Sequence, residues 1–180
     1  MSERNQYRNT LAHAESRSTM TELEREGSML TATAPIHIKR MALTFHHDLP
    51  GFKGARNFMI EPLGEPGAEV FASLRCSDTV YVQENVPIPN LVLLTMSPGA
   101  FWADYEVHVE DAMVAELELT EPENAALLVI VHPKDPLSDS TVNLYSPIVY
   151  NLQTGAADQL VPAASEQEIG WSIRAPFPNE

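Results

Sequence analysis

The sequence predicts an all-β domain with one short helix. Two observations support this prediction. Short apolar runs recur at intervals of roughly ten residues and are separated by turn residues, which is typical of a β-sandwich or a small barrel. The chain also contains fourteen prolines against eight glycines. Proline lacks a backbone N–H, so it ends helices and lies at turns and strand edges.

The expected strands follow one another from residue 41 onward. In YEVHV, Tyr105, Val107 and Val109 alternate with Glu106 and His108, as in a strand with one buried face. The near-continuous apolar run at 90–96 predicts a strand buried on both faces. The expected strands are 41–46, 57–63, 69–74, 79–83, 90–96, 105–109, 126–133 and 141–151, followed by the short runs 159–162 and 171–177.

The one segment expected to be helical is residues 110–119. Met113, Val114 and Leu117 lie on one face of a helix at this spacing. Glu110 and Asp111 are in the first turn, where the helix dipole favours negative charge. The prolines at 122 and 133 bound the helix and the strand that follows it.

The chain divides into two parts by composition. Residues 1–33 are polar, mixed in charge and without apolar periodicity, so we expect a disordered or weakly helical N-terminal extension. Residues 34–180 are expected to form the folded β domain. The first residues lack the apolar core of a signal peptide, and no apolar run approaches the ~20 residues that span a bilayer, so we expect a cytoplasmic protein that does not enter the membrane.

The formal net charge is −14, and it is distributed unevenly. Residues 41–180 contain five basic and twenty acidic residues. Such a domain repels phosphate backbones, so direct nucleic-acid binding is not expected. The charge favours a basic protein partner, or else it only keeps the protein soluble.

The residue types that carry chemistry are dispersed. His46 and His47 are neighbours that point to opposite faces of a strand, and the other histidines have no second ligand at metal-binding spacing. His47 and Asp48 resemble a base and its orienting acid only in sequence. Cys76, the single cysteine, cannot form an intramolecular disulfide and is expected to be passive. We therefore expect no enzyme, no cofactor and no metal site, which leaves a module that works by binding.

Several motifs occur in order between about residues 35 and 177. The first is a Leu-Pro-Gly-Phe turn, and the second is a Pro…Asp-Tyr segment in mid-chain. The third and most specific is a Thr-x-Asn-Leu-x-x-Pro-Ile-Val block, which a hairpin and a Gln-Leu strand follow. The residues that carry these motifs are Leu49, Pro50, Gly51, Phe52, Pro98, Asp104, Tyr105, Thr141, Asn143, Leu144, Pro147, Ile148, Val149, Gln159 and Leu160.

In these motifs, and in the closing WSIRAPF run with Arg174 and Pro176, the chain resembles the flagellar assembly factor FliW family. The segment 74–90 departs from the family pattern and contains extra residues. The resemblance implies a small antiparallel β-barrel-like domain that is not an enzyme. It also implies binding to the translational regulator CsrA, which relieves repression of flagellin mRNA, and binding to flagellin in a partner switch.

The alternative is a flagellin-specific chaperone without CsrA antagonism. We expect a monomer when the protein is free. Asn143 is expected to fix a turn or bulge through hydrogen bonds to the backbone, and Pro147 to mark an edge or bend. The partner-binding candidates are aromatic residues with neighbouring carboxylates: Trp102, Asp104, Tyr105, Glu106, Glu110 and Asp111. Trp102 and Tyr105 fit a core position equally well.

Overall fold

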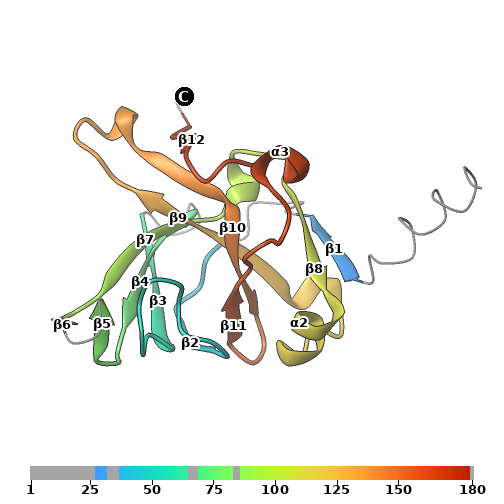
Figure 1. Ribbon diagram of the computed structural model, residues 1–180, viewed down its shortest axis with the longest axis horizontal. Coiled ribbons are helices and arrows are strands. Elements are labelled where there is room, and N and C mark those ends of the chain that lie inside the picture. Colours follow the sequence, from blue (N-terminus) through green and yellow to red (C-terminus); the bar gives the residue numbers. More distant parts are fainter. Residues whose placement is uncertain (1–26, 32–36, 65–68, 83–85, 179–180) are drawn as a thin grey trace, which may run out of the picture.

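Seven strands form a closed β-barrel in the computed structural model, which describes residues 27–31, 37–64, 69–82 and 86–178 (Figure 1). The barrel strands, in the order in which they pair, are β11 (Ala156–Gln159), β2 (Met41–Phe45), β3 (Asn57–Leu63), β4 (Phe71–Cys76), β7 (Val92–Met96), β9 (Ala125–His132) and β10 (Thr141–Asn151). A short strand, β12 (Ala175–Pro176), pairs with the start of β10. The predicted all-β fold is confirmed.

The barrel closes at β11. This strand pairs antiparallel with β10, where Ile148 lies opposite Gln159, and parallel with β2, where Ala157 lies opposite Phe45. All the other pairs in the barrel are antiparallel. The prediction of an antiparallel barrel is therefore correct except along this one seam.

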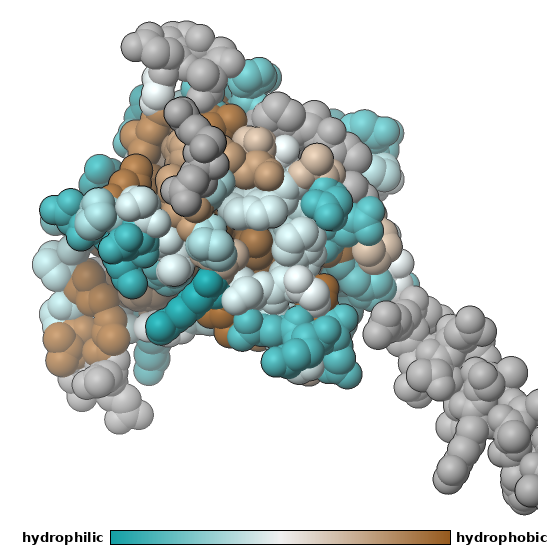
Figure 2. Space-filling model, turned by 90° about the horizontal axis from the view of Figure 1, so that it is seen from above, coloured by the Kyte–Doolittle hydropathy of each residue, from teal (hydrophilic) through white to brown (hydrophobic). Residues whose placement is uncertain are grey.

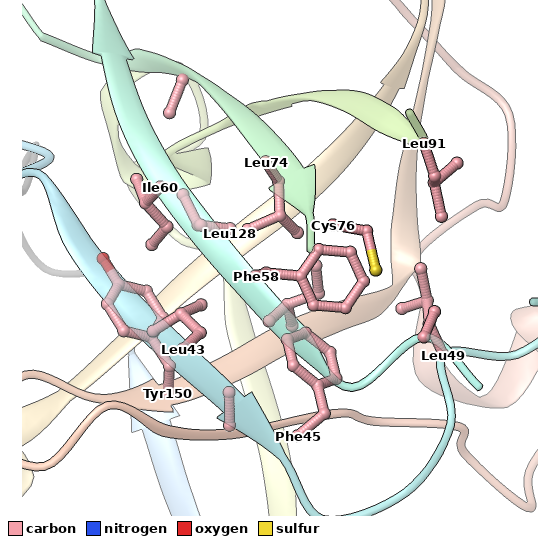
Figure 3. Packing of buried hydrophobic residues seen from close by; sticks show 14 of the residues in the cluster. Leu43, Phe45, Leu49, Phe58, Ile60, Leu74, Cys76, Leu91, Leu128 and Tyr150 are labelled. Carbon is pink, nitrogen blue, oxygen red and sulfur yellow. The ribbon is translucent and has the colours of Figure 1, made fainter. Parts of the chain in front are cut away.

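Alternate residues of the barrel strands point inward and form the first hydrophobic core (Figure 3). Phe45 of β2 and Phe58 of β3 lie against each other with ring centroids 4.9 Å apart. Leu74 of β4, Leu128 of β9 and Tyr150 of β10 complete the packing from the other strands. These side chains are 2% exposed or less, so a continuous interior fixes the barrel wall.

A second core lies between the outer face of the barrel wall and an added layer. That layer consists of β1 (Gly27–Thr31), β8 (Glu106–Glu110) and α2 (Asp111–Glu116). Leu30, Val107 and Leu117 from this layer share a hydrophobic cluster with Leu127 and Val129 of β9. Figure 1 shows β1, β8 and α2 together on the right of the barrel.

Strand β1 corrects the predicted domain boundary. We placed residues 1–33 outside the folded domain, yet Gly27–Thr31 pairs with β8 in five consecutive positions and Leu30 is 8% exposed. The sequence of this segment, GSMLT, has no alternation of apolar and polar residues, so the pairing with β8 determines its conformation. The predicted character of residues 1–26 lies outside the described residues.

The predicted helix is confirmed in a shorter form. Helix α2 ends at Glu116, and Leu117 at its C-terminus is fully buried, while Met113 and Val114 pack against the second core. The prediction of a single helix was incomplete, because α3 (Glu166–Ile169) follows β11. Ser165 and Glu168 form a capping box at its start, a sequence signal that the prediction did not use.

The remaining elements are short. The segment that departs from the family pattern contains β5 (Val80–Val82) and β6 (Val86–Ile88), which pair with each other. Figure 2 shows a hydrophobic area at the left edge of the molecule, where Figure 1 places β5 and β6. Three 3₁₀ turns, η1 (Pro98–Ala100), η2 (Pro122–Asn124) and η3 (Leu137–Asp139), complete the described elements. Among the described residues, no helix is both long and apolar enough to cross a membrane.

Strand β10 is irregular in its middle, as predicted. Its register with β9 shifts between Asn143 and Ile148. The side-chain oxygen of Asn143 accepts hydrogen bonds from the backbone N–H groups of Tyr145 and Ser146, at 3.2 and 3.0 Å. Pro147 lies in the irregular part, where its missing N–H removes no bond to β9. The structural roles expected for Asn143 and Pro147 are confirmed.

Candidate binding site

A groove of about 780 Å³ lies between the Leu49–Phe52 turn, strands β7 and β9 and the irregular part of β10. Leu49, Pro50 and Phe52 line it together with Asn143 and Tyr145. These two sets belong to the two sequence motifs at 49–52 and 141–149, which lie far apart in the chain. The residues that distinguish the sequence therefore meet at one hollow in the surface.

In the Leu49–Phe52 turn, Leu49 is buried and the next residue, Pro50, is exposed. The Leu49 side chain is 1% exposed and packs in the first core, and its N–H donates to the carbonyl of Ala55 at 3.0 Å. Gly51 has a φ of +86°, which favours glycine, and the Phe52 N–H closes the turn on the Leu49 carbonyl at 2.8 Å. Pro50 is exposed at the groove.

A side-chain hydrogen bond joins β10 and β11 within the groove lining. Gln159 lines the groove, and its side-chain amide donates to the carbonyl of Ser146 at 2.9 Å. Three apolar residues that line the groove are well exposed: Val92 at 41%, Val161 at 62% and Ile173 at 41%. Exposed apolar side chains around a concave surface are typical of a site that binds an apolar segment of a partner. This exposure also corrects one expectation, because Val92 of β7 is not buried on both faces.

A second surface, the acidic face, consists of Asp104, Glu106, Glu110 and Asp111. All four residues are exposed, and none of them forms an ion pair within the part of the chain that the structure describes. Glu106 and Glu110 project from the same side of β8, because side chains alternate along a strand. No lysine or arginine occurs between Arg75 and Lys134, so the sequence supplies no counter-charge here. Such a face attracts a basic partner.

The two aromatic candidates beside the acidic face differ in exposure. Tyr105 is fully buried, its ring lies 4.8 Å from that of Trp171, and it belongs to the second core. Burial also raises the pKa of its hydroxyl. Tyr105 offers no surface to a partner, so its place among the contact candidates was wrong and the core alternative holds. Trp102 is half-buried against the same core, and its neighbour Phe101, which was not predicted, is 43% exposed.

The residues considered for chemistry are separated in the fold. Asp48 accepts hydrogen bonds from Arg56 Nε at 2.6 Å and from the N–H of Gly54, and these hold the pKa of its carboxyl below the usual value. His47 instead pairs with Asp158, and that hydrogen bond raises the pKa of its imidazole. The Cys76 side chain is buried, which raises the pKa of the thiol and makes it a poor nucleophile, as predicted.

A closed barrel with an apolar groove and an unpaired acidic face defines a small β-barrel protein with two surfaces suited to binding other proteins. The chain belongs to the FliW family, because the family model described as "FliW protein" matches residues 28–176.

Similar proteins carry the same family name. The chain is 29% identical over 141 residues to the flagellar assembly factor FliW of Oceanobacillus iheyensis, covering 78% of this chain and 88% of that protein. It is 30% identical over 119 residues to the FliW of Bacillus licheniformis, covering 66% of this chain and 76% of that protein. A crystal structure of the flagellar assembly factor FliW superposes with a TM-score of 0.61 at 22% identity, over 85% of this chain and 99% of that chain.

Proposed function

We propose that this protein is a non-enzymatic flagellar assembly factor that binds a CsrA-type translational regulator and flagellin in alternation. Binding the regulator relieves repression of flagellin mRNA. Accumulating flagellin then displaces the regulator, which couples flagellin synthesis to its secretion. We place this partner switch in the cytoplasm, with the free protein monomeric and without direct nucleic-acid contact.

The acidic face is the observation that carries the proposal. A regulator that binds RNA needs basic surface, and four exposed carboxylates without ion pairs in the described structure are complementary to it. Complementary charge accelerates association. Salt screens this attraction and weakens the effect, because the Debye length is about 10 Å at 0.1 M. A bound acidic domain also repels phosphate near the RNA site of the regulator.

The groove supports the second half of the switch. Its lining includes Val92, Val161 and Ile173, all at least 41% exposed, which an apolar segment of flagellin would cover. The groove and the acidic face use different residues. Variants at each surface can therefore test the two partners separately.

A charge-reversal pair tests regulator binding. We expect Glu106→Lys/Glu110→Lys to weaken binding of the cognate CsrA-type regulator roughly tenfold or more in isothermal titration at low salt. The matched control is Asp135→Lys/Asp139→Lys, which makes the same change in charge at exposed positions near η3. Flagellin added to the wild-type complex should displace the regulator. Failure of the folded protein to bind the regulator at low salt would refute this half of the proposal.

The alternative is a flagellin-specific chaperone without CsrA antagonism. The paired strands β5 and β6, in the segment that departs from the family pattern, favour it because they add Tyr81 and Val86 as exposed apolar contacts. The same titration decides between the two functions. Binding of flagellin without any binding of the regulator supports the chaperone.

A further inference from the structure

Three metal-ligating side chains from distant segments meet on one side of the barrel. His47 follows β2, Glu116 is the last residue of α2, and Asp158 lies in β11. One ligand atom from each of the three lies within 4.8 Å of the ligand atoms of the other two. The His47 Nδ1 and the Asp158 Oδ2 are 2.5 Å apart and share a proton. No spacing pattern indicates this cluster, because His47 and Asp158 are 111 residues apart.

The closing seam of the barrel brings the backbones of the first two ligands together. The N–H of His46 donates to the carbonyl of Ala157 at 3.1 Å, which sets His47 beside Asp158. The Asp158 side chain is 6% exposed, and its Oδ1 accepts the N–H of Gln159 at 2.9 Å. The Asp158 carboxylate is thus buried and hydrogen-bonded through one oxygen, with its second oxygen directed at His47. The His47 side chain is 70% exposed and retains room to move.

The third ligand is positioned by the end of α2. The side-chain amide of Asn151 donates to the carbonyls of Leu117 and Glu118, both at 3.0 Å. Asn151 is 2% exposed and ends β10, immediately before the hairpin that leads into β11. Leu117 is fully buried in the second core. Glu116 is therefore fixed at its backbone, while its exposed side chain is free to turn toward His47 and Asp158.

An imidazole nitrogen with two carboxylates is a ligand set for a divalent transition metal. Zinc binds such nitrogen and oxygen atoms at about 2.0–2.2 Å in tetrahedral geometry, so two of its ligands lie roughly 3.4 Å apart. The two atoms of His47 and Asp158 that are now 2.5 Å apart need to separate by about 1 Å, which the exposed His47 side chain allows, and the ion then replaces the proton between them. Imidazole suits zinc, copper, iron and nickel, whereas magnesium and calcium prefer oxygen ligands.

We propose that His47, Glu116 and Asp158 form a binding site for a divalent transition metal ion of the zinc type, which links α2 to the barrel seam. Water would complete the coordination, because His47 and Glu116 are open to solvent. The site does not depend on the proposed partners. Its structural effect is to fasten the acidic helix α2 to β11 and to the segment after β2.

The test is a titration of the full chain with Zn²⁺ by isothermal calorimetry, with Mg²⁺ as the comparison ion. We expect one saturable Zn²⁺ site and none for Mg²⁺. His47→Gln and Glu116→Gln should each weaken this site at least tenfold. The matched controls are His46→Gln and Glu118→Gln, which remove exposed neighbours outside the cluster and should leave the affinity unchanged.

A second readout locates the ion without relying on affinity. Co²⁺ in the site should give a visible absorption band in the wild-type protein that Zn²⁺ abolishes and that is lost in Asp158→Asn. Two outcomes would overturn the proposal. The first is the absence of saturable Zn²⁺ binding in the wild-type protein. The second is equal affinity in His46→Gln and His47→Gln, which would assign the binding to other residues.

Discussion

The hydroxyl of Tyr105 donates a hydrogen bond of 2.6 Å to the backbone carbonyl of Leu144. Both residues are buried in the second core, and Leu144 lies in the irregular part of β10. This bond joins the segment before β8 to the strand that lines the groove. It satisfies a carbonyl that the register shift leaves without a partner on β9.

Removing the Tyr105 hydroxyl should destabilise the protein. Tyr105→Phe leaves the Leu144 carbonyl unsatisfied in a buried position, and we expect a loss of about 1–3 kcal/mol in the free energy of unfolding, measured in urea. Tyr81→Phe is the control, because Tyr81 is 38% exposed on β5. Equal stability of the two variants would contradict a structural role for the hydroxyl.

Asn143 should be replaceable only by a residue that keeps its side-chain oxygen. In Asn143→Ala the N–H groups of Tyr145 and Ser146 lose their acceptor, and we expect a loss of about 1–2 kcal/mol. Asn143→Asp retains an acceptor oxygen at the same place and should be closer to the wild type. The order of the urea midpoints checks this prediction, and an alanine variant as stable as the aspartate variant would refute it.

Asp78 should make the stability of the protein depend on acid pH. Burial raises the pKa of its carboxyl, but hydrogen bonds from the Asn57 side chain and from the N–H groups of Asn57 and Arg56 outweigh burial and lower it. Because the folded pKa is below the ordinary 3.8, the stabilisation is complete above that value and is lost as the pH falls through the folded pKa.

The variant Asp78→Ala measures this contribution. At pH 7 it should be less stable than the wild type by about 1–3 kcal/mol. The difference should shrink as the pH falls from 3.8 through the lower folded pKa, because the unfolded wild-type chain binds a proton at Asp78 before the folded chain does. Asp139→Ala, at an exposed residue of η3, provides the reference for a change that breaks no such bonds. A difference that stays constant from pH 7 to the acid range would show that these bonds do not depend on the charge.

A pair of valine variants tests the groove. Val161 lines the groove and is 62% exposed, whereas Val86 on β6 is 61% exposed and lies outside it. We expect Val161→Asp to weaken flagellin binding at least tenfold, because the new carboxylate would be buried against an apolar segment. Val86→Asp should bind as the wild type does. Weaker flagellin binding by Val86→Asp, with unchanged binding by Val161→Asp, would place the flagellin site at the paired strands β5 and β6 and favour the chaperone function.

Local pattern was enough to predict most of the fold. Alternation at Tyr105–Val109 and the apolar runs of β3, β9 and β10 reflect a period of two, which depends only on neighbours in the chain. Strand β1 was not predicted, because its sequence GSMLT has no alternation of apolar and polar residues and forms a strand through pairing with β8. Helix α3 has four residues, which is too short for any periodicity.

The candidate site was less predictable, because its parts come from distant segments. Tyr105 satisfied two patterns at once: alternation indicated burial, and the carboxylates beside it indicated an interface. The complete burial of Tyr105, whose hydroxyl bonds to Leu144, decides between them. The groove needs the 49–52 turn to lie beside β10, and the His47–Asp158 pair needs the barrel to close. Neither relationship leaves a periodic signal in the sequence.

The parallel seam between β11 and β2 has a consequence for synthesis. A chain emerging from a ribosome makes β2 early, but β2 gains this neighbour only after Gln159 has been made. Until then the sheet has open edges, and such edges pair readily with other chains. Pairing across so long a stretch of chain is also slow. Val161 and Ile173, which line the groove, also come after β10. The groove can therefore bind a partner only after the segment that follows β10 has been made and has folded.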